Sequence, residues 1–118
     1  MSIVSLINLT PHAINLYDSE GEEVVSVLPV SGSIARAKEE IIKVEGLYTE
    51  EIVYPVVEKA YSAVENLPPP TPGKVYVVSI VVKAALPNRD DLYCPDTGPG
   101  SAVRDHQGRV LGVRRLQS

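Results

Sequence analysis

Residues 74–94, KVYVVSIVVKAALPNRDDLYC, contain the longest apolar run of the chain and end in a polar cluster. The residues at 75–78 are β-branched or aromatic and follow a proline-glycine pair, which predicts a buried strand. Ser79 can cap a short helix over 80–86, because its hydroxyl can accept a hydrogen bond from a free amide at the helix start. The proline that follows ends the helix. We expect Lys83 to be its one exposed position.

The polar cluster is the charged turn Asn88-Arg89-Asp90-Asp91. Three interpretations are open: the aspartates bind a divalent metal, they bind a ribose or a base edge while Arg89 takes a phosphate, or they only close the turn after the helix. Adjacent aspartates on an extended chain point apart, and the chain has neither a His-x-x-x-His motif nor paired cysteines. We therefore expect no metal and no other cofactor.

The length of 118 residues is that of one domain, which we assign to residues 1–118. Hydrophobic residues make up 44% and charged residues 22%, as in globular proteins. With six Tyr but no Phe or Trp, the core must be built from Val, Ile, Leu and Ala. The single cysteine, Cys94, excludes an internal disulfide and suits a reducing compartment; without a nearby histidine it is expected to be a small buried hydrophobe.

Neither a signal peptide nor an apolar run long enough to span a bilayer is visible, so we expect a cytoplasmic protein without a membrane contact. The net charge is −4, and residues 39–65 carry seven acids against two bases. This acidic middle argues against binding to long nucleic acids. Four arginines between 101 and 118 could still serve one small anion or an acidic partner. Self-association is left open.

Short strands are predicted over most of the chain. Residues 3–9, 13–17 and 23–28 show strand patterns, with a hairpin turn at Asp18-Ser19-Glu20-Gly21. Residues 34–45 could form one longer strand with a bend.

Residues 47–65 are ambiguous. Helical spacing occurs between Val53 and Val64, but 52–57 is rich in β-formers and contains Pro55, which costs about 3 kcal/mol inside a helix and is tolerated at a sheet edge. We favour a strand for 51–58 and leave 59–65 open.

The proline-rich segment 67–73 is a stiff connector, and residues 101–104 and 109–116 flank a turn with Gly108 at the left-handed position, which predicts a terminal hairpin. The sum is an α+β fold, mainly an antiparallel curled sheet or partial barrel with one short helix.

Four groups of residues carry a resemblance to a known family. They are Asn8-Leu9-Thr10-Pro11-His12-Ala13-Ile14, Ser31-Gly32 with Ala35-Arg36, Arg89-Asp90-Asp91-Leu92, and Val103-Arg104-Asp105 with Gly108-Arg109 and Gly112. In this order, over nearly the whole chain, they resemble a family of small uncharacterised phage- and prophage-type proteins. The resemblance implies action in a host cytoplasm. By analogy with other small phage proteins, it also implies a block of host defence, for example by sequestering or degrading a nucleotide signal.

Three further residues are candidates for a site. His12 follows Thr-Pro at a turn and could be a general base, a phosphate donor or an ordinary turn histidine. Arg36 would share a strand face with Ile34, where it either faces a ligand anion or pairs with Asp90 or Asp91. Ser31 opens a small-residue turn whose amides could hold an anion, although the spacing of a phosphate loop is missing. His106 is expected to be an exposed turn residue.

Two function classes follow, with a third beside them. In a ligand-binding module, His12, Arg36, Arg89, Asp90 and Ser31 would hold a small anion such as a nucleotide, with a tyrosine stacked on the base. In a metal-independent phosphodiesterase or N-glycosidic hydrolase, His12 would act as acid or base, with Asp90 or Asp91 as its partner. In a structural or protein-interaction module, these polar residues would only pair with one another.

Overall fold

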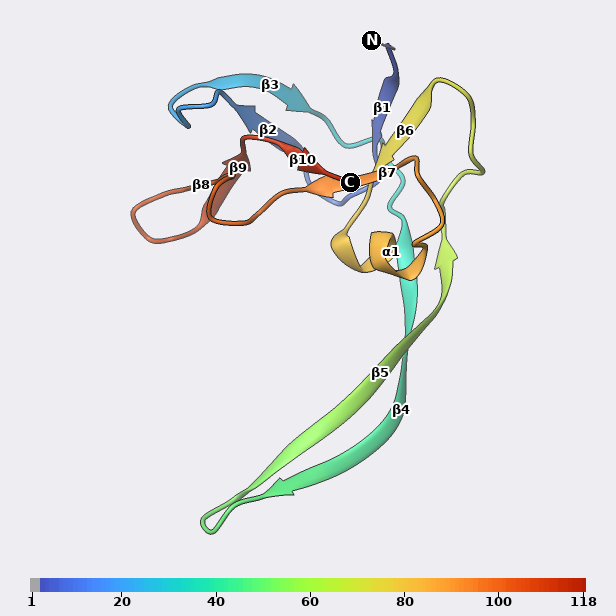
Figure 1. The fold of residues 1–118 in the computed structure, drawn as a ribbon, viewed down its shortest axis with the longest axis vertical. Coiled ribbons are helices and arrows are strands. Elements are labelled where there is room, and N and C mark those ends of the chain that lie inside the picture. The colour runs from blue at the N-terminus through green and yellow to red at the C-terminus, as the bar shows by residue number, and fades with distance from the viewer. Residues whose placement is uncertain (1–2) are drawn as a thin grey trace.

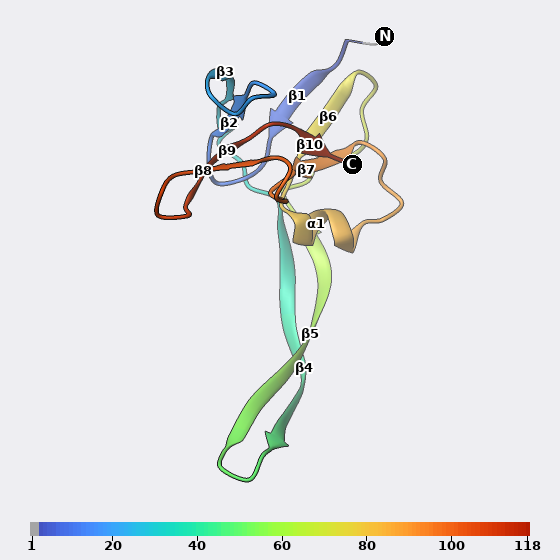
Figure 2. The ribbon, with the colours of Figure 1, turned by 60° about the vertical axis from the view of Figure 1, so that its left-hand side comes forward.

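The computed structural model describes residues 3–118, without the side chain of Ser62. The chain forms a head of two small sheets and one helix, from which a long two-stranded arm projects (Figures 1 and 2). The elements in chain order are β1 (Ser5–Asn8), β2 (Ile14–Tyr17), β3 (Val24–Leu28), β4 (Arg36–Tyr48), β5 (Val53–Glu65), β6 (Lys74–Val77), α1 (Ile80–Ala85), β7 (Leu92–Pro95), β8 (Ala102–Arg104), β9 (Val110–Val113) and β10 (Leu116–Gln117). None of the helical segments in the described part is long and apolar enough to cross a membrane.

The first sheet has the strand order β1-β6-β7-β10, in which β1, β6 and β7 run parallel. The crossover from β6 through α1 to β7 confirms the strand and helix expected in 74–94. Tyr76, Val77 and Val78 are buried, and Val75 is half-buried. The Ser79 hydroxyl accepts a hydrogen bond from the Val82 amide at 3.3 Å, as the predicted cap requires.

The second sheet has the order β3-β2-β9-β8 and joins the two hairpins expected from the sequence. Gly21 and Gly108 have φ values of 73° and 82°, so both turns use the left-handed conformation that glycine tolerates. The returning strand of the terminal hairpin is interrupted at Arg114. Its first part, β9, lies in the second sheet, and its last part, β10, pairs with β7 in the first.

The prediction of a curled, mainly antiparallel sheet or partial barrel is correct only at the level of an α+β fold. The strands are divided among sheets of four, four and two strands, and three of the pairings are parallel. The helical crossover returns the chain to the start of β6, which forces β7 to run parallel to it.

The expectation that Lys83 is the exposed position of α1 was also wrong. Only Val82 of this helix is buried, while Ile80, Val81 and Ala84 are exposed and Lys83 is half-buried. The helix lies at the base of the arm (Figure 1). It touches the body of the head through one side and leaves an apolar side uncovered next to residues 59–61 of β5.

The arm consists of β4 and β5, each 13 residues long and paired antiparallel. The strand expected over 34–45 and its bend are confirmed, because the register shifts between Ala37 and Glu39. Residues 59–65, which the sequence left open, continue β5. Pro55 lies opposite Gly46 in a two-stranded ribbon, where each strand has a free edge and a missing N–H is tolerated.

The core of the head is small. Its main cluster of buried apolar side chains consists of Leu9, Ala35, Tyr76, Val78, Val82 and Leu92. They come from the parallel sheet, from α1 and from the residue that precedes the arm, so the arm is attached to the core only at its base.

One buried side chain ties the loops around this core together. The Asn8 amide nitrogen donates to the carbonyl oxygens of His12 at 2.9 Å and Leu28 at 3.3 Å. Its amide oxygen accepts from the Thr10 N–H at 2.9 Å and from the Thr10 hydroxyl at 2.6 Å. The Asn8 carbonyl accepts from the Ser31 N–H at 3.2 Å. Asn8 therefore joins the end of β1 to the start of β2 and to the exit from β3.

Replacing Asn8 with Ala should lower the free energy of unfolding by about 3 kcal/mol, because partly buried backbone groups of Thr10, His12 and Leu28 lose their hydrogen-bond partner. Urea unfolding monitored by circular dichroism measures this. Asn15→Ala is the matched control, since the Asn15 amide makes one exposed hydrogen bond, to the Leu111 carbonyl at 3.1 Å. Equal losses in the two variants would contradict the role assigned to Asn8.

Candidate functional site

The carboxyl ends of the parallel strands β1, β6 and β7 lie at one edge of the first sheet. The loops that follow them begin at Leu9, Val78 and Asp96. In open sheets with parallel strands, this is the edge at which ligands bind, because the loops diverge there and leave a crevice.

Two neighbouring hollows occur beside this edge. The first, which we call the His12 hollow, has a volume of about 290 Å³. Its polar lining residues are Thr10, His12, Ser79 and Thr97. The second, the Arg36 hollow, has a volume of about 360 Å³, and its polar lining residues are Arg36, Glu39, Tyr61 and Ser79. Ser79 borders both hollows, so two of the residues expected from the sequence, His12 and Arg36, lie on adjoining parts of one surface.

His12 is exposed and held by its backbone. Its carbonyl accepts from the Asn8 amide and, at 3.0 Å, from the Thr10 hydroxyl. The imidazole makes no hydrogen bond to any described residue, so neither Asp90 nor Asp91 is its partner. The histidine–aspartate pair required by the hydrolase hypothesis is therefore not formed in this arrangement.

Arg36 is the first residue of β4 and is exposed in the Arg36 hollow. Its neighbour Glu39 is already paired with Lys59, whose Nζ lies 2.6 Å from the Glu39 carboxylate. Within residues 3–118 the Arg36 guanidinium forms no ion pair, so it does not make the expected pair with Asp90 or Asp91. It is an available donor for an external anion.

Arg89 is in a different position. Its Nε and Nη2 donate to the two carboxylate oxygens of Asp91 at 2.7 and 2.8 Å, and Nη2 also donates to the Pro68 carbonyl at 3.1 Å. The pair precedes β7, and neither residue lines the two hollows. The half-buried, bidentate geometry closes the turn after α1 and anchors the proline-rich connector.

This ion pair shifts both ionisable groups. The hydrogen bond from Arg89 is the main cause that lowers the pKa of Asp91 below its ordinary value of 3.8, and burial opposes it. The same hydrogen bond raises the pKa of Arg89. Asp90, in contrast, is exposed and makes no side-chain hydrogen bond to the described residues.

Ser31 lies outside both hollows. Its hydroxyl donates to the Ser33 carbonyl at 3.2 Å and accepts from the Ser33 N–H at 3.3 Å, which satisfies the turn from within. Gly32 in this turn has a φ of 96°. The structure therefore places His12 and Arg36 together, and Ser31 and the Arg89–Asp91 pair apart from them.

Sequence reasoning missed the residues that shape the edge. Asp96 accepts from the Gly98 N–H at 3.0 Å and pairs with Arg115 at 2.7 Å, and this arginine is the main cause that lowers the pKa of Asp96. The Asp-Thr-Gly order of 96–98 is typical of a turn closed by its own aspartate and could have indicated this. Cys94 is buried, as expected, and burial raises the pKa of its thiol.

In residues 3–118 no group of three or more His, Cys, Asp or Glu side chains has the geometry to hold a metal ion. Comparisons of the chain with protein families, curated proteins and solved structures found no match.

Asp91→Asn should destabilise the protein at neutral pH, and the difference from the parent should disappear in acid. The lowered pKa of Asp91 stabilises the folded state above pH 3.8, and this contribution is lost as the pH falls through the folded-state value. Urea unfolding between pH 7 and pH 2 measures the difference. Asp90→Asn is the control and should follow the parent at every pH. A gap for Asp91→Asn that stays constant with pH would refute the assigned ion pair.

Proposed function

We propose that this chain is a protein-interaction module that binds its partner through the arm. The observation that carries this proposal is the exposure of large apolar side chains along β4 and β5. Tyr48 is 82% exposed, Val44 72% and Leu47 59%. Contiguous apolar surface of this kind marks interaction sites, because monomeric proteins otherwise keep it covered.

The shape of the molecule supports the same conclusion. The Cα radius of gyration is 17.6 Å, whereas a compact chain of this length has a value of about 13–14 Å. A two-stranded ribbon is marginally stable in water at best, since one layer of strands has nothing to bury its side chains against. The arm is therefore expected to gain much of its stability from the surface that it binds.

The charged side chains of the outer arm are confined to one face, and the other face is apolar. In the register of the ribbon, Val44 pairs with Val57, and Tyr48 pairs with Val53. Paired residues share a face, and so do residues two apart, which places all four together with Gly46 and Pro55. The opposite face carries Lys43, Glu45 and Glu58 beside Leu47, Val56 and Tyr54. One face of the outer arm is therefore free of charge and suited to burial.

A photo-crosslinking amino acid at position 48 tests this proposal in cells that express the protein. We expect crosslinks at position 48 and none at the control position 106, in the exposed turn of the terminal hairpin. The double variant Val44→Thr/Val57→Thr should reduce the crosslinks, because it makes the apolar face polar while keeping β-branched side chains. Equal crosslinking at both positions, or none at position 48, would overturn the proposal.

A second candidate function is the binding of a small anion, such as a nucleotide, in the Arg36 hollow. The specific support is that Arg36 has no ionic partner among the described residues and lines this hollow together with Ser79 and Tyr61. The neighbouring His12 hollow adds an imidazole and two threonine hydroxyls.

A thermal-shift screen of mono-, di- and cyclic nucleotides tests this second candidate. A ligand at a hundredfold excess over its dissociation constant should stabilise the folded state by about 2.7 kcal/mol. Arg36→Ala should weaken binding about ten-fold or more, through the loss of a charge-assisted contact. Arg104→Ala, which removes an exposed arginine outside both hollows, is the control. The absence of any shift, or unchanged binding by Arg36→Ala, would exclude this site.

A further inference from the structure

We infer that the partner of the arm is a second copy of this chain. The two arms would lie antiparallel across a two-fold axis, so that the tip of each arm docks at the base of the other. This inference rests on the proposed interaction through the arm and specifies its partner. It is supported by three independent features of the arm: its apolar ends, its charges and its free edges.

The apolar features occur at both ends of the arm. The tip carries five exposed apolar side chains, which are Leu47, Tyr48, Ile52, Val53 and Tyr54. At the base, a hollow of about 390 Å³ lies between β5 and α1, lined by Lys59, Ala60, Tyr61, Ile80, Val81, Ala84 and Ala85. We call it the basal hollow. Ile80 is 62% exposed there, and the uncovered side of α1 forms one wall. A surface of this composition fits the aromatic and aliphatic side chains of the tip.

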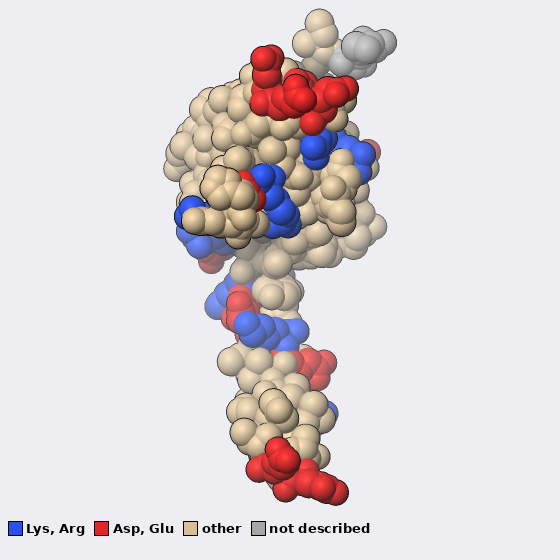
Figure 3. All heavy atoms as spheres, turned by 90° about the vertical axis from the view of Figure 1, so that its left-hand side faces the viewer, with Lys and Arg blue, Asp and Glu red and all other residues tan. Residues whose placement is uncertain are grey.

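The tip of the arm is acidic, and the base, which also carries Glu39, Glu40 and Glu65, holds two basic side chains that form no ion pair. Glu50 and Glu51 lie at the tip, in a turn that Thr49 holds through hydrogen bonds of its hydroxyl with the Ile52 carbonyl at 2.8 Å and the Ile52 amide at 3.1 Å. Arg36 and Lys38 lie at the base and form no ion pair within the part of the chain that the structure describes. Figure 3 shows acidic side chains alone at the free end of the arm, and basic side chains interspersed with acidic ones nearer the head.

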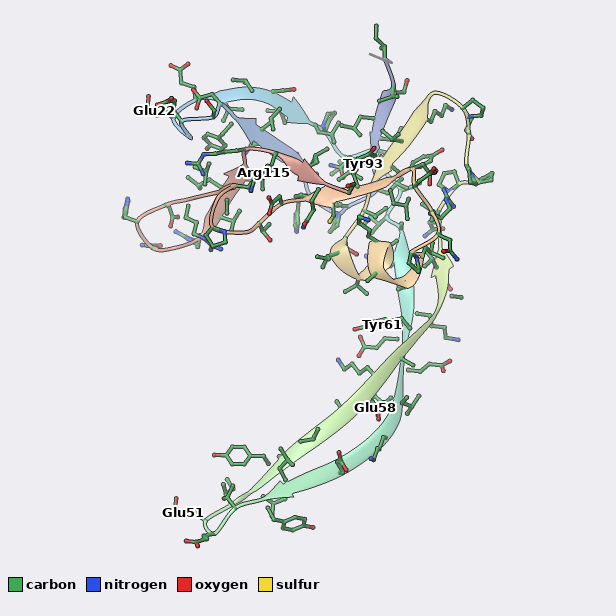
Figure 4. All side chains as sticks on the ribbon, in the orientation of Figure 1. Glu22, Glu51, Glu58, Tyr61, Tyr93 and Arg115 are labelled. Atoms are coloured by element: carbon green, nitrogen blue, oxygen red, sulfur yellow. The ribbon has the colours of Figure 1, made fainter. Side chains whose placement is uncertain are left out.

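An antiparallel pair of identical arms brings each tip to the base of the other arm. Because both arms have the same length, a two-fold axis near their middle places each tip beside the opposite base. Figure 4 shows the span involved, with Tyr61 near the head, Glu58 along the arm and Glu51 at the tip. One arm face together with the tip and the basal hollow approaches the roughly 20–30 residues per partner of a standard interface.

The edges of the ribbon favour contact between faces over an open-ended addition of strands. The turn pair Thr49–Ile52 is hydrogen-bonded, with the Thr49 N–H donating to the Ile52 carbonyl at 3.0 Å. Hydrogen-bonded and non-hydrogen-bonded pairs alternate along the ribbon, so Gly46–Pro55 is a non-hydrogen-bonded pair. The backbone nitrogen of Pro55, which carries no hydrogen, therefore points to the outer edge of β5. On β4, the register shift between Ile41 and Lys43 leaves Ile42 as a bulge. Proline and bulges are common protections against edge-to-edge pairing, so a closed dimer is favoured over a fibre.

Sedimentation of the purified full chain tests the inference through charge reversal. The parent should sediment as a dimer, with about twice the chain mass of 12.8 kDa. Glu50→Lys/Glu51→Lys at the tip and Arg36→Glu/Lys38→Glu at the base should each weaken self-association by about ten-fold or more, because like charges then meet at both contacts. An equimolar mixture of the two variants should recover the dimer, since both contacts of the mixed pair again join opposite charges.

The matched control is Glu20→Lys/Glu22→Lys, which makes the same charge change in the exposed turn between β2 and β3 and should leave the dimer unchanged. A monomeric parent, a dimer that resists both arm variants, or a mixture that fails to recover would overturn the inference. Crosslinks from position 48 to a different protein would also overturn it while leaving the proposed interaction through the arm intact. If position 48 gives no crosslinks at all, both the dimer and the proposed interaction through the arm are excluded.

Discussion

The head depends on the satisfied amide of Asn8. This side chain lies at the end of β1 and is 1% exposed. It contacts the loop between β1 and β2 and the end of β3. In such a small core, a buried amide is tolerated only because both its nitrogen and its oxygen find partners. The same contacts position His12 and the segment that leads from β3 into the arm. One side chain thus connects the sheet, the candidate ligand surface and the base of the arm.

Many apolar side chains of the arm are exposed, whereas those in the core of the head are buried. In the head, a few side chains such as Tyr76, Val77 and Val82 are almost completely buried. In the arm, residues of the same types face solvent, because a ribbon of two strands has no second layer. The exposed side of α1 extends this surface to the head. The apolar side chains that the arm and α1 leave exposed are best explained by binding to another protein chain.

Charged residues divide into two groups according to their partners. Arg89 with Asp91 and Arg115 with Asp96 form bonded pairs that close loops at opposite ends of β7. Their main role is structural, since their donors are already used. Arg36 keeps its donors free at the junction of head and arm. This position serves a small anion and a carboxylate from another chain equally well, so the two candidate functions would compete for one guanidinium.

Local sequence patterns determined the strand at 75–78, the helix capped by Ser79, both glycine turns and the bent strand that became β4, because periodicity, capping and left-handed turns depend on neighbouring residues. Tertiary structure alone decided the rest. A valine or tyrosine at 53–65 has the same strand preference in a buried sheet and in an exposed ribbon, so the arm could not be distinguished from core. Parallel pairing, the role of Asn8 and the choice of Asp91 as the partner of Arg89 depend on contacts set by the path of the chain, which no local pattern encodes.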